Sequence, residues 1–383
     1  MPSLLLRLVL TRSGDCLLHI RAYLDRLLVN ANILETLVLH SHRWHTLDLQ
    51  ISLFLLRILG TQTKHKGFPS LSRLTLSLVD EDGQSFRGDP LEAFQSAPKL
   101  ESVSVNTRRS SLVKLPWSNL RHLSIREISA GEFLRVFGST VNLVECSLLV
   151  GPPYQLQIDN GGAGAVSLPL RQSALKTLLL CCKPDVLGDL ELPALENLYI
   201  AETTLSKFCF NPLISLFHRS TCDIQVLGLS GILLYDDGLH DALSTLPNLV
   251  ELILADWTPT TPESWSLNSL VADLTVHEGS MAPPLVPKLR TLVVDDYSSG
   301  RTVDGDLLAS MVESRMCGSG GGLIKLGLHG VSLRINGLDV LGRLRQFKEE
   351  MSFMVTVGHS DIVENNFGWK SKSGSAVSIK MKD

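Results

Sequence analysis

The sequence predicts an α/β solenoid, in which short parallel strands form a concave sheet and helices pack outside it. Three observations lead to this prediction. Leucine supplies 73 of the 383 residues, and hydrophobic residues make up 44% of the chain. A phrase of the form Pro-x-Leu-x-x-Leu-x-Leu recurs along the chain, and segments with helical spacing lie between its copies.

Eleven copies of the phrase can be recognised, some of them weak. The first has Trp44 in place of the leading leucine. The copies begin about 28 residues apart on average, which is typical of leucine-rich repeats. They lie at residues 43–49, 68–76, 97–105, 117–125, 140–149, 172–180, 192–200, 222–229, 246–254, 286–294 and 321–328.

The alternation of side chains along a strand assigns a direction to each position of the phrase. Counting from the first apolar residue, positions four and six point into the core, and positions three, five and seven point to the concave face. Each repeat leaves one apolar side bare, so stacking must bury it. We therefore expect an irregular leucine-rich-repeat solenoid, or horseshoe, of about 11 repeats over residues 44–356. A helix and strand cap at 1–43 precedes it, and a polar tail at 357–383 follows.

Helix signals lie between the strand phrases. Asp304 has the character of an N-cap, and Ser129 and Glu132 have capping-box spacing. The asparagine that regular leucine-rich repeats carry after the last leucine is absent, so the loops should be irregular. The expected helices cover residues 23–34, 91–97 (opened by Asp89 and Pro90), 133–137, 305–316 and 335–347.

Composition excludes several classes of function. The chain has 35 basic and 39 acidic residues, a net charge of −4, so we expect no nucleic-acid or anionic-membrane partner. No stretch is long and apolar enough for a membrane-spanning helix, and no signal peptide is expected. Seven scattered cysteines without metal-like spacing favour a reducing, intracellular location, either cytoplasmic or nuclear.

No cluster carries a convincing catalytic or metal-binding pattern. His40, His42 and His45 form an H-x-H-x-x-H cluster, but on a strand His45 would point away from the other two. Cys181 and Cys182 end a strand, where Cys182 should pack in the core and Cys181 should be exposed. We expect no enzyme activity, no metal and no cofactor. The acidic groups at 80–82, 236–237 and 295–296 fit turns and caps, and the glycine runs at 160–167 and 318–322 fit loops.

The concave face is the remaining candidate site. Its early repeats are polar, whereas its later repeats include an apolar track that is typical of a protein-binding surface. An alternative is that helices or the insertions at 151–170 and 257–285 cover this track. The candidate partner-binding residues are Arg73, His122, Arg126, Leu149, Leu179, Tyr199, Val226, Ile253 and Val293.

The N-terminal region resembles the leucine-rich region of the large F-box-like family of mushroom-forming fungi. The resemblance rests on Arg12-Ser13-Gly14, Cys16, Leu18, residues 40–44 (His-Ser-His-Arg-Trp) and the repeat leucines, and it extends to about residue 356. It implies a module that recognises a protein substrate.

The same family carries an F-box, which docks on the Skp1 adaptor of ubiquitin ligases. An F-box would occupy about 40 to 50 residues ahead of Arg12, and Met1 stands only eleven residues before it. We therefore expect a recognition module whose partner is a protein. The alternative is a ubiquitin-ligase substrate adaptor that docks Skp1 through a truncated or unrecognised segment, for instance the apolar residues Leu4, Leu5, Leu6, Leu8, Val9 and Leu10.

Overall fold

The chain divides into two compact units in the computed structural model. Unit 1 comprises Met1–Val166 and Leu170–Leu175, and unit 2 comprises Ser167–Pro169 and Lys176–Asp383. The structure describes residues 2–24, 27–63, 66–79, 92–106, 113–126, 128, 130–149, 169–181, 184–201, 209–231, 238–255, 267–277, 283–295, 302–316, 322–329, 331–334, 343 and 354–357.

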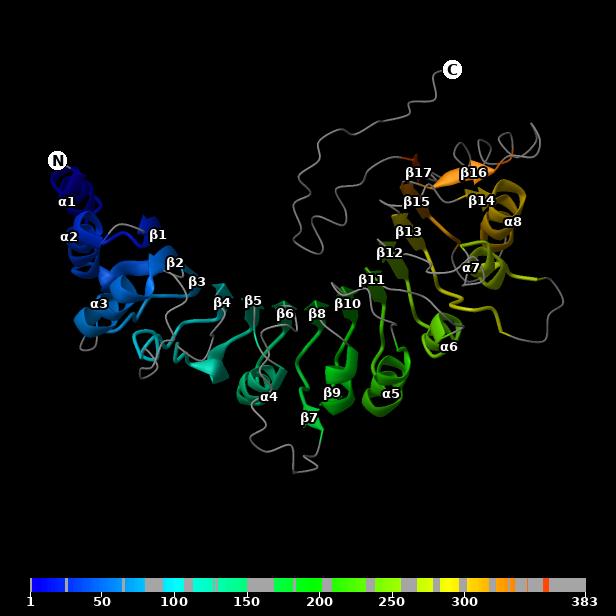
Figure 1. Ribbon diagram of the computed structural model, residues 1–383, viewed down its shortest axis with the longest axis horizontal. Coiled ribbons are helices and arrows are strands. Elements are labelled where there is room, and N and C mark those ends of the chain that lie inside the picture. The colour runs from blue at the N-terminus through cyan, green and yellow to red at the C-terminus, as the bar shows by residue number, and fades with distance from the viewer. Residues whose placement is uncertain are drawn as a thin grey trace, which may run out of the picture. The chain divides into compact units, whose positions relative to one another are not determined.

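Unit 1 contains a parallel sheet whose strands follow chain order. The strands β1, β2, β3, β4, β5 and β6 lie side by side in this order, and neighbouring strands pair in parallel. Its helices gather on one side of these strands (Figure 1). The helices are α1 (Pro2–Arg12), α2 (Leu27–Val38), α3 (Leu53–Thr63) and α4 (Ala130–Ser139), and the strands are β1 (Leu18–Leu24), β2 (Trp44–Ser52), β3 (Arg73–Val79), β4 (Ser102–Asn106), β5 (His122–Arg126), β6 (Glu145–Leu149) and the short β7 (Leu170–Arg171).

Unit 2 repeats this arrangement. The strands β8, β10, β11, β12, β13, β15 and β17 pair in parallel in this order. A separate parallel pair joins β14 to β16. The helices are α5 (Asn211–Ser220), α6 (Gly238–Ser244), α7 (Leu267–Leu274) and α8 (Gly305–Met316), and the strands are β8 (Thr177–Cys181), β9 (Leu190–Glu191), β10 (Asn197–Ala201), β11 (Val226–Ser230), β12 (Glu251–Ala255), β13 (Thr291–Asp295), β14 (Thr302–Asp304), β15 (Lys325–His329), β16 (Ser332–Arg334) and β17 (Met354–Val357).

All eleven repeat phrases form strands of these sheets, so the prediction of an α/β chain with parallel strands is confirmed. Two strands without the phrase extend these parallel ladders. The strand β1 pairs with β2, so the sheet already begins within the segment 1–43 that we expected to be a cap. The strand β17 pairs with β15 beyond the last phrase.

The Pro-x-Leu part of the phrase forms a tight turn before the strand. The backbone N–H of Leu195 donates to the carbonyl of Leu192 at 3.2 Å, across Pro193. Proline suits the second position of such a turn because its φ is already fixed near the required value. The same bond recurs in Phe68 to Leu71, Ala97 to Leu100, Leu246 to Leu249 and Val286 to Leu289.

The core of each unit follows the predicted alternation of side chains. Leu74 and Leu76 of β3 are fully buried, as are the corresponding residues of most other strands. In unit 1 the buried rings of Trp44, Phe68 and Phe94 stack on one another, with centroid separations of 5.3 and 5.2 Å. Trp44, which stands where the other repeats have a leucine or another apolar residue, is the first ring of this stack.

Long polar side chains tie neighbouring segments together. The buried Arg43 donates to the carbonyl of Cys16 at 2.9 Å and to Ser13 Oγ at 2.6 Å, with a longer bond of 3.4 Å to Leu10 O. These contacts hold the loop after α1, where Gly14 has a φ of +51°. The Arg-Ser-Gly and Arg-Trp motifs therefore contact each other, because Arg43 of the second motif donates to Ser13 of the first.

Comparable ties occur in unit 2. The buried Arg315 of α8 donates to the carbonyls of Leu274, Leu285 and Val286, and burial lowers the pKa of its guanidinium to about 10. Arg219 of α5 donates to Leu187 O and Leu190 O, both at 2.9 Å. In both cases an arginine side chain donates to backbone carbonyls of segments that precede the repeat strands.

Some predicted helices form and others do not. Asp304 caps α8 as expected, since Asp304 Oδ1 accepts the N–H of Asp306 at 3.0 Å and that of Leu307 at 3.2 Å. Residues 92–97 form turns rather than the expected helix. Other expectations fall outside the described residues, namely those on Ser129, Cys182, the helix at 335–347 apart from Arg343, the acidic groups at 80–82 and 236–237, residue 296, the glycine runs at 160–167 and 318–321, and the tail after residue 357.

Candidate functional site

The exposed face of the sheet in unit 1 consists of three rows of side chains in register. The row of Thr46, Arg73, Ser102, His122 and Glu145 crosses β2 to β6 at position three of the phrase. The central row holds Asp48, Thr75, Ser104, Ser124 and Ser147, and the last row holds Gln50, Ser77, Asn106, Arg126 and Leu149. The register therefore assembles the polar early repeats into one surface.

Burial separates the two faces of this sheet. In β3, β4, β5 and β6 every side chain at positions three, five and seven is exposed or half-buried, whereas every side chain at positions four and six is buried. Arg73, His122 and Arg126 are exposed, and Leu149 is half-buried. These four candidate residues therefore lie on one accessible surface, as the strand period predicts.

Strand β1 extends the three rows by a further strand. His19, Arg21 and Tyr23 stand in register with Thr46, Asp48 and Gln50. Arg21 Nε lies 2.7 Å from Asp48 Oδ2, and His19 Nδ1 lies 2.8 Å from Thr46 Oγ1. We did not predict these residues as part of the face, because β1 lacks the repeat phrase.

At the other end of the surface, His122 faces Glu145. Their side-chain atoms Nε2 and Oε2 are 3.8 Å apart, and both side chains are about half exposed. This pair and the Arg21–Asp48 pair flank the central strands, so the carboxylates of the face in unit 1 lie at its two ends.

In unit 2 the candidate residues have two different environments. Leu179, Tyr199 and Val226 are half-buried on the face, whereas Ile253 and Val293 are fully buried. Ile253 and Val293 are therefore not part of an accessible apolar track. Neither side chain is accessible to a partner in this structure. Burial, together with the negative charge of Glu251, raises the pKa of Tyr199.

Two buried polar residues also lie on this face of unit 2. Asp295 and His329 stand opposite each other in β13 and β15, and each is only 1% exposed. The sequence placed both at position seven of their phrases but did not indicate that they would be buried. Side-chain alternation alone cannot report what lies above a sheet.

The histidine cluster does not adopt the strand geometry that we expected. His40 lies in a turn, and His42 lies in a single turn of 3-10 helix, Ser41–Arg43, that precedes β2. Burial, together with the charges of Arg43 and His42, lowers the pKa of His40. Among the residues that the structure describes, no group of three or more histidine, cysteine or acidic side chains is arranged to hold a metal ion.

The expectation for Cys181 is wrong, because its side chain is buried at the end of β8. Cys146 is also buried, and burial strongly raises the pKa of its thiol, whereas Cys16 and Cys209 are exposed. Within the described part of the chain, no helix is both long and apolar enough to cross a membrane.

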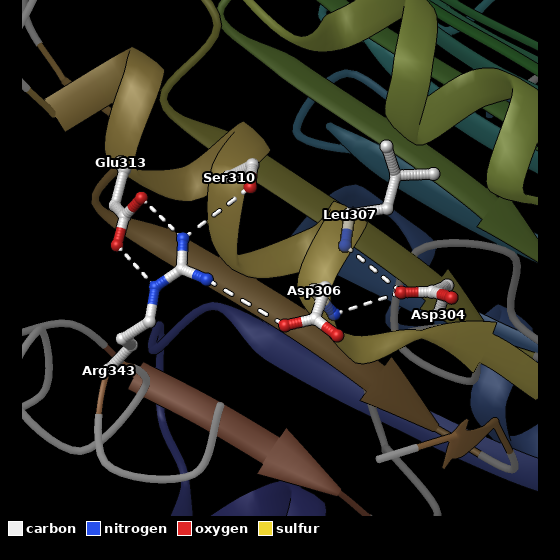
Figure 2. Close-up of polar contacts among 6 residues, drawn as sticks. All are labelled: Asp304, Asp306, Leu307, Ser310, Glu313 and Arg343. Atoms are coloured by element: carbon white, nitrogen blue, oxygen red, sulfur yellow. Dashed lines mark hydrogen bonds and ion pairs between the residues drawn. The ribbon is translucent and has the colours of Figure 1, made fainter. Parts of the chain in front are cut away.

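A charged cluster on α8 involves Arg343, as Figure 2 shows. The Nε of Arg343 donates to Glu313 at 2.7 Å, a second nitrogen donates to the other oxygen of the same carboxylate, and Asp306 lies 3.8 Å away. These hydrogen bonds lower the pKa of Glu313 and keep it ionised. The cluster ties Arg343 to α8.

The helix α1 exposes most of its apolar side chains. Leu4, Leu5, Leu8 and Val9 are between 48% and 76% exposed, whereas Leu10 is buried and Leu6 is half-buried. Residues spaced by one turn share a helix face, so the four exposed residues form one apolar strip.

Comparison with known proteins adds no family assignment. No model of a known protein family matches the chain, and no curated protein matches it.

Proposed function

We propose that the chain is an irregular leucine-rich-repeat solenoid and that it recognises a partner protein through the exposed face of its parallel strands. The observation that carries the proposal is the accessible, in-register surface of β3 to β6, where twelve side chains are exposed or half-buried. The sheet beneath is held rigidly by a buried leucine core, so the rows present their side chains at fixed spacing.

The composition of this face supports a protein ligand. Its polar side chains are spread over several strands rather than gathered in a deep cavity, which is typical of protein interfaces and differs from small-molecule sites. In unit 2, Tyr199 lies in register with Leu179, and the two half-buried side chains supply an aromatic and an aliphatic contact. Tyrosine is frequent among residues that dominate binding energy.

Site-specific photo-crosslinking of the full chain tests the proposal. A benzophenone amino acid replaces Ser104, which lies at the centre of the face, and in the control it replaces Ser139, which is exposed on α4. We expect position 104 to capture one reproducible protein from a lysate, and position 139 not to. Unmodified chain should compete with this capture, whereas chain carrying Ser124→Trp and Ser147→Trp should not. Equal capture from both positions would contradict the proposal.

A second candidate is a substrate adaptor of ubiquitin ligases that docks Skp1 through α1. The observation that favours it is the exposed apolar strip of Leu4, Leu5, Leu8 and Val9. Purified chain should then retain Skp1, and Leu4→Asp with Leu8→Asp should abolish retention without changing the thermal unfolding temperature. The double variant Leu39→Asp and Phe54→Asp is the control, because it also replaces two exposed apolar side chains but lies outside α1. Absence of Skp1 from chain that still captures another protein through its sheet face would exclude this candidate.

A further inference from the structure

We propose that the central strands of unit 1 bind an extended, carboxylate-bearing segment of the partner protein. This inference rests on the proposed function and names the chemistry that the face recognises. The surface concerned, here called the donor patch, lies on β3, β4 and β5. It consists of Arg73, Thr75, Ser77, Ser102, Ser104, Asn106, His122, Ser124 and Arg126.

Every side chain of the donor patch can donate a hydrogen bond. The nine residues are two arginines, one histidine, one asparagine and five hydroxyl residues, and none is acidic. All nine are exposed or half-buried. Although the whole chain carries a net charge of −4, this patch carries two fixed positive charges. A surface of donors with a positive charge is complementary to an anionic ligand.

The two arginines of the patch are available to a ligand. The guanidinium groups of Arg73 and Arg126 make no ion pair with the described carboxylates, and both residues are exposed. The other exposed arginine of the face differs, because Arg21 already pairs with Asp48. Arginine binds carboxylates through two parallel hydrogen bonds, so each free guanidinium is a site for one acidic side chain.

The spacing of these arginines favours a peptide over a single small anion. Within the donor patch, Arg73 lies in the first row on β3 and Arg126 lies in the last row on β5. Ser104 lies between them, in the central row on β4. With strands about 4.8 Å apart and a rise of about 3.3 Å per residue, the Cα atoms of the two arginines are about 16 Å apart.

A distance of about 16 Å is the length of about five extended residues and exceeds the screening length of about 8 Å at physiological salt. The two positive charges therefore act as separate sites. Thr75, Ser104 and Ser124 lie between them and can bind backbone carbonyls of the segment. An extended segment with acidic residues near both ends matches this diagonal.

Fluorescence anisotropy of labelled peptides on the full chain tests the inference. The probe is a fluorescein-labelled decapeptide of alternating glutamate and glycine, and the comparison peptides carry glutamine or lysine in place of glutamate. We expect the glutamate peptide to bind at least tenfold more tightly than either comparison peptide, and to lose affinity as salt is added. The double variant Arg73→Ser and Arg126→Ser should weaken its binding by at least tenfold.

A matched double variant controls for net charge. Arg121→Ser with Arg290→Ser also removes two exposed arginines, but these residues precede their strands and lie outside the three rows. It should bind the glutamate peptide as the unmodified chain does. Ser104→Asp, which places a negative charge at the centre of the patch, should weaken binding while circular dichroism shows an unchanged fold.

Three results would overturn the inference: no binding of the glutamate peptide by folded chain, equal binding of the glutamine peptide, or equal losses in the two double arginine variants. The crosslinking experiment separates this failure from that of the proposed function. If position 104 still captures a protein while the peptide tests fail, the face binds a partner of different chemistry. If both fail, the face is not the binding surface.

Discussion

The buried guanidinium of Arg43 offers a sharp test of how the N-terminal part of unit 1 is held together. Its hydrogen bonds to Cys16 O, Ser13 Oγ and Leu10 O fasten α1 and the following loop to the start of β2. The change Arg43→Ala removes all three donors at once. It also takes this donor from Cys16 O in a partly buried site, whereas Leu10 O still accepts from the hydroxyl of Ser13.

The expected cost follows from the geometry. A hydrogen bond to a charged group contributes about 1.5–3 kcal/mol, and two of the three bonds are well formed, at 2.9 and 2.6 Å. Because Cys16 is exposed, water can replace one donor, so we expect a loss of about 3 kcal/mol. For a unit of about 170 residues this corresponds to a fall in Tm of about 6–12 °C.

The matched control is Arg21→Ala. Arg21 lies in the neighbouring strand β1 and makes one exposed ion pair with Asp48, which is worth at most about 1 kcal/mol. Thermal unfolding followed by circular dichroism gives the two Tm values, and amide hydrogen exchange locates the loss to residues 2–16. If Arg43→Ala and Arg21→Ala lower the Tm equally, the buried hydrogen bonds of Arg43 do not stabilise the N-terminal region more than an exposed ion pair does, and the reasoning is wrong.

Three other outcomes follow from the structure. Phe68→Ala should lower the free energy of unfolding by about 3–5 kcal/mol in chemical denaturation, because it empties the middle of a buried aromatic stack. Arg343→Ala should destabilise the chain above pH 4.5, and this loss should disappear once the pH falls below the lowered pKa that Glu313 has in the folded chain. Arg343 lowers the pKa of Glu313 from 4.5, so their contact contributes stability above that value and loses it as the pH falls through the folded pKa. Mass spectrometry after thiol alkylation should find Cys209 modified in the folded chain, and Cys146 only after unfolding, because burial raises the pKa of the Cys146 thiol.

Each of these outcomes has a control. Phe54, which is exposed on α3, should tolerate alanine with little change in stability, and an equal loss at Phe54 and Phe68 would contradict the packing argument. Glu313→Gln should remove the pH dependence attributed to Arg343, so its persistence would assign that dependence to another group. Rapid alkylation of Cys146 in folded chain would show that β6 is less protected than the structure indicates.

Periodicity alone was sufficient to locate the eleven strands that carry the phrase. The phrase places apolar residues at alternate positions after a proline turn, and both features act over a few residues, so all eleven copies became parallel strands. The same alternation correctly separated the accessible positions of β3 to β6 from the buried ones. Local signals likewise identified Asp304 as the cap of α8.

Only the tertiary structure decided which strands without the phrase join the sheet and which face residues stay accessible. Strand β1 alternates apolar and polar residues but lacks the repeat phrase. Its pairing with β2, beside the bond from Arg43 to Cys16, joins segments that are distant in sequence. Ile253 and Val293 carry the same phrase position as Ser104, yet they are buried. The direction of a side chain is a local property of the strand, whereas its accessibility depends on what the rest of the chain places above it.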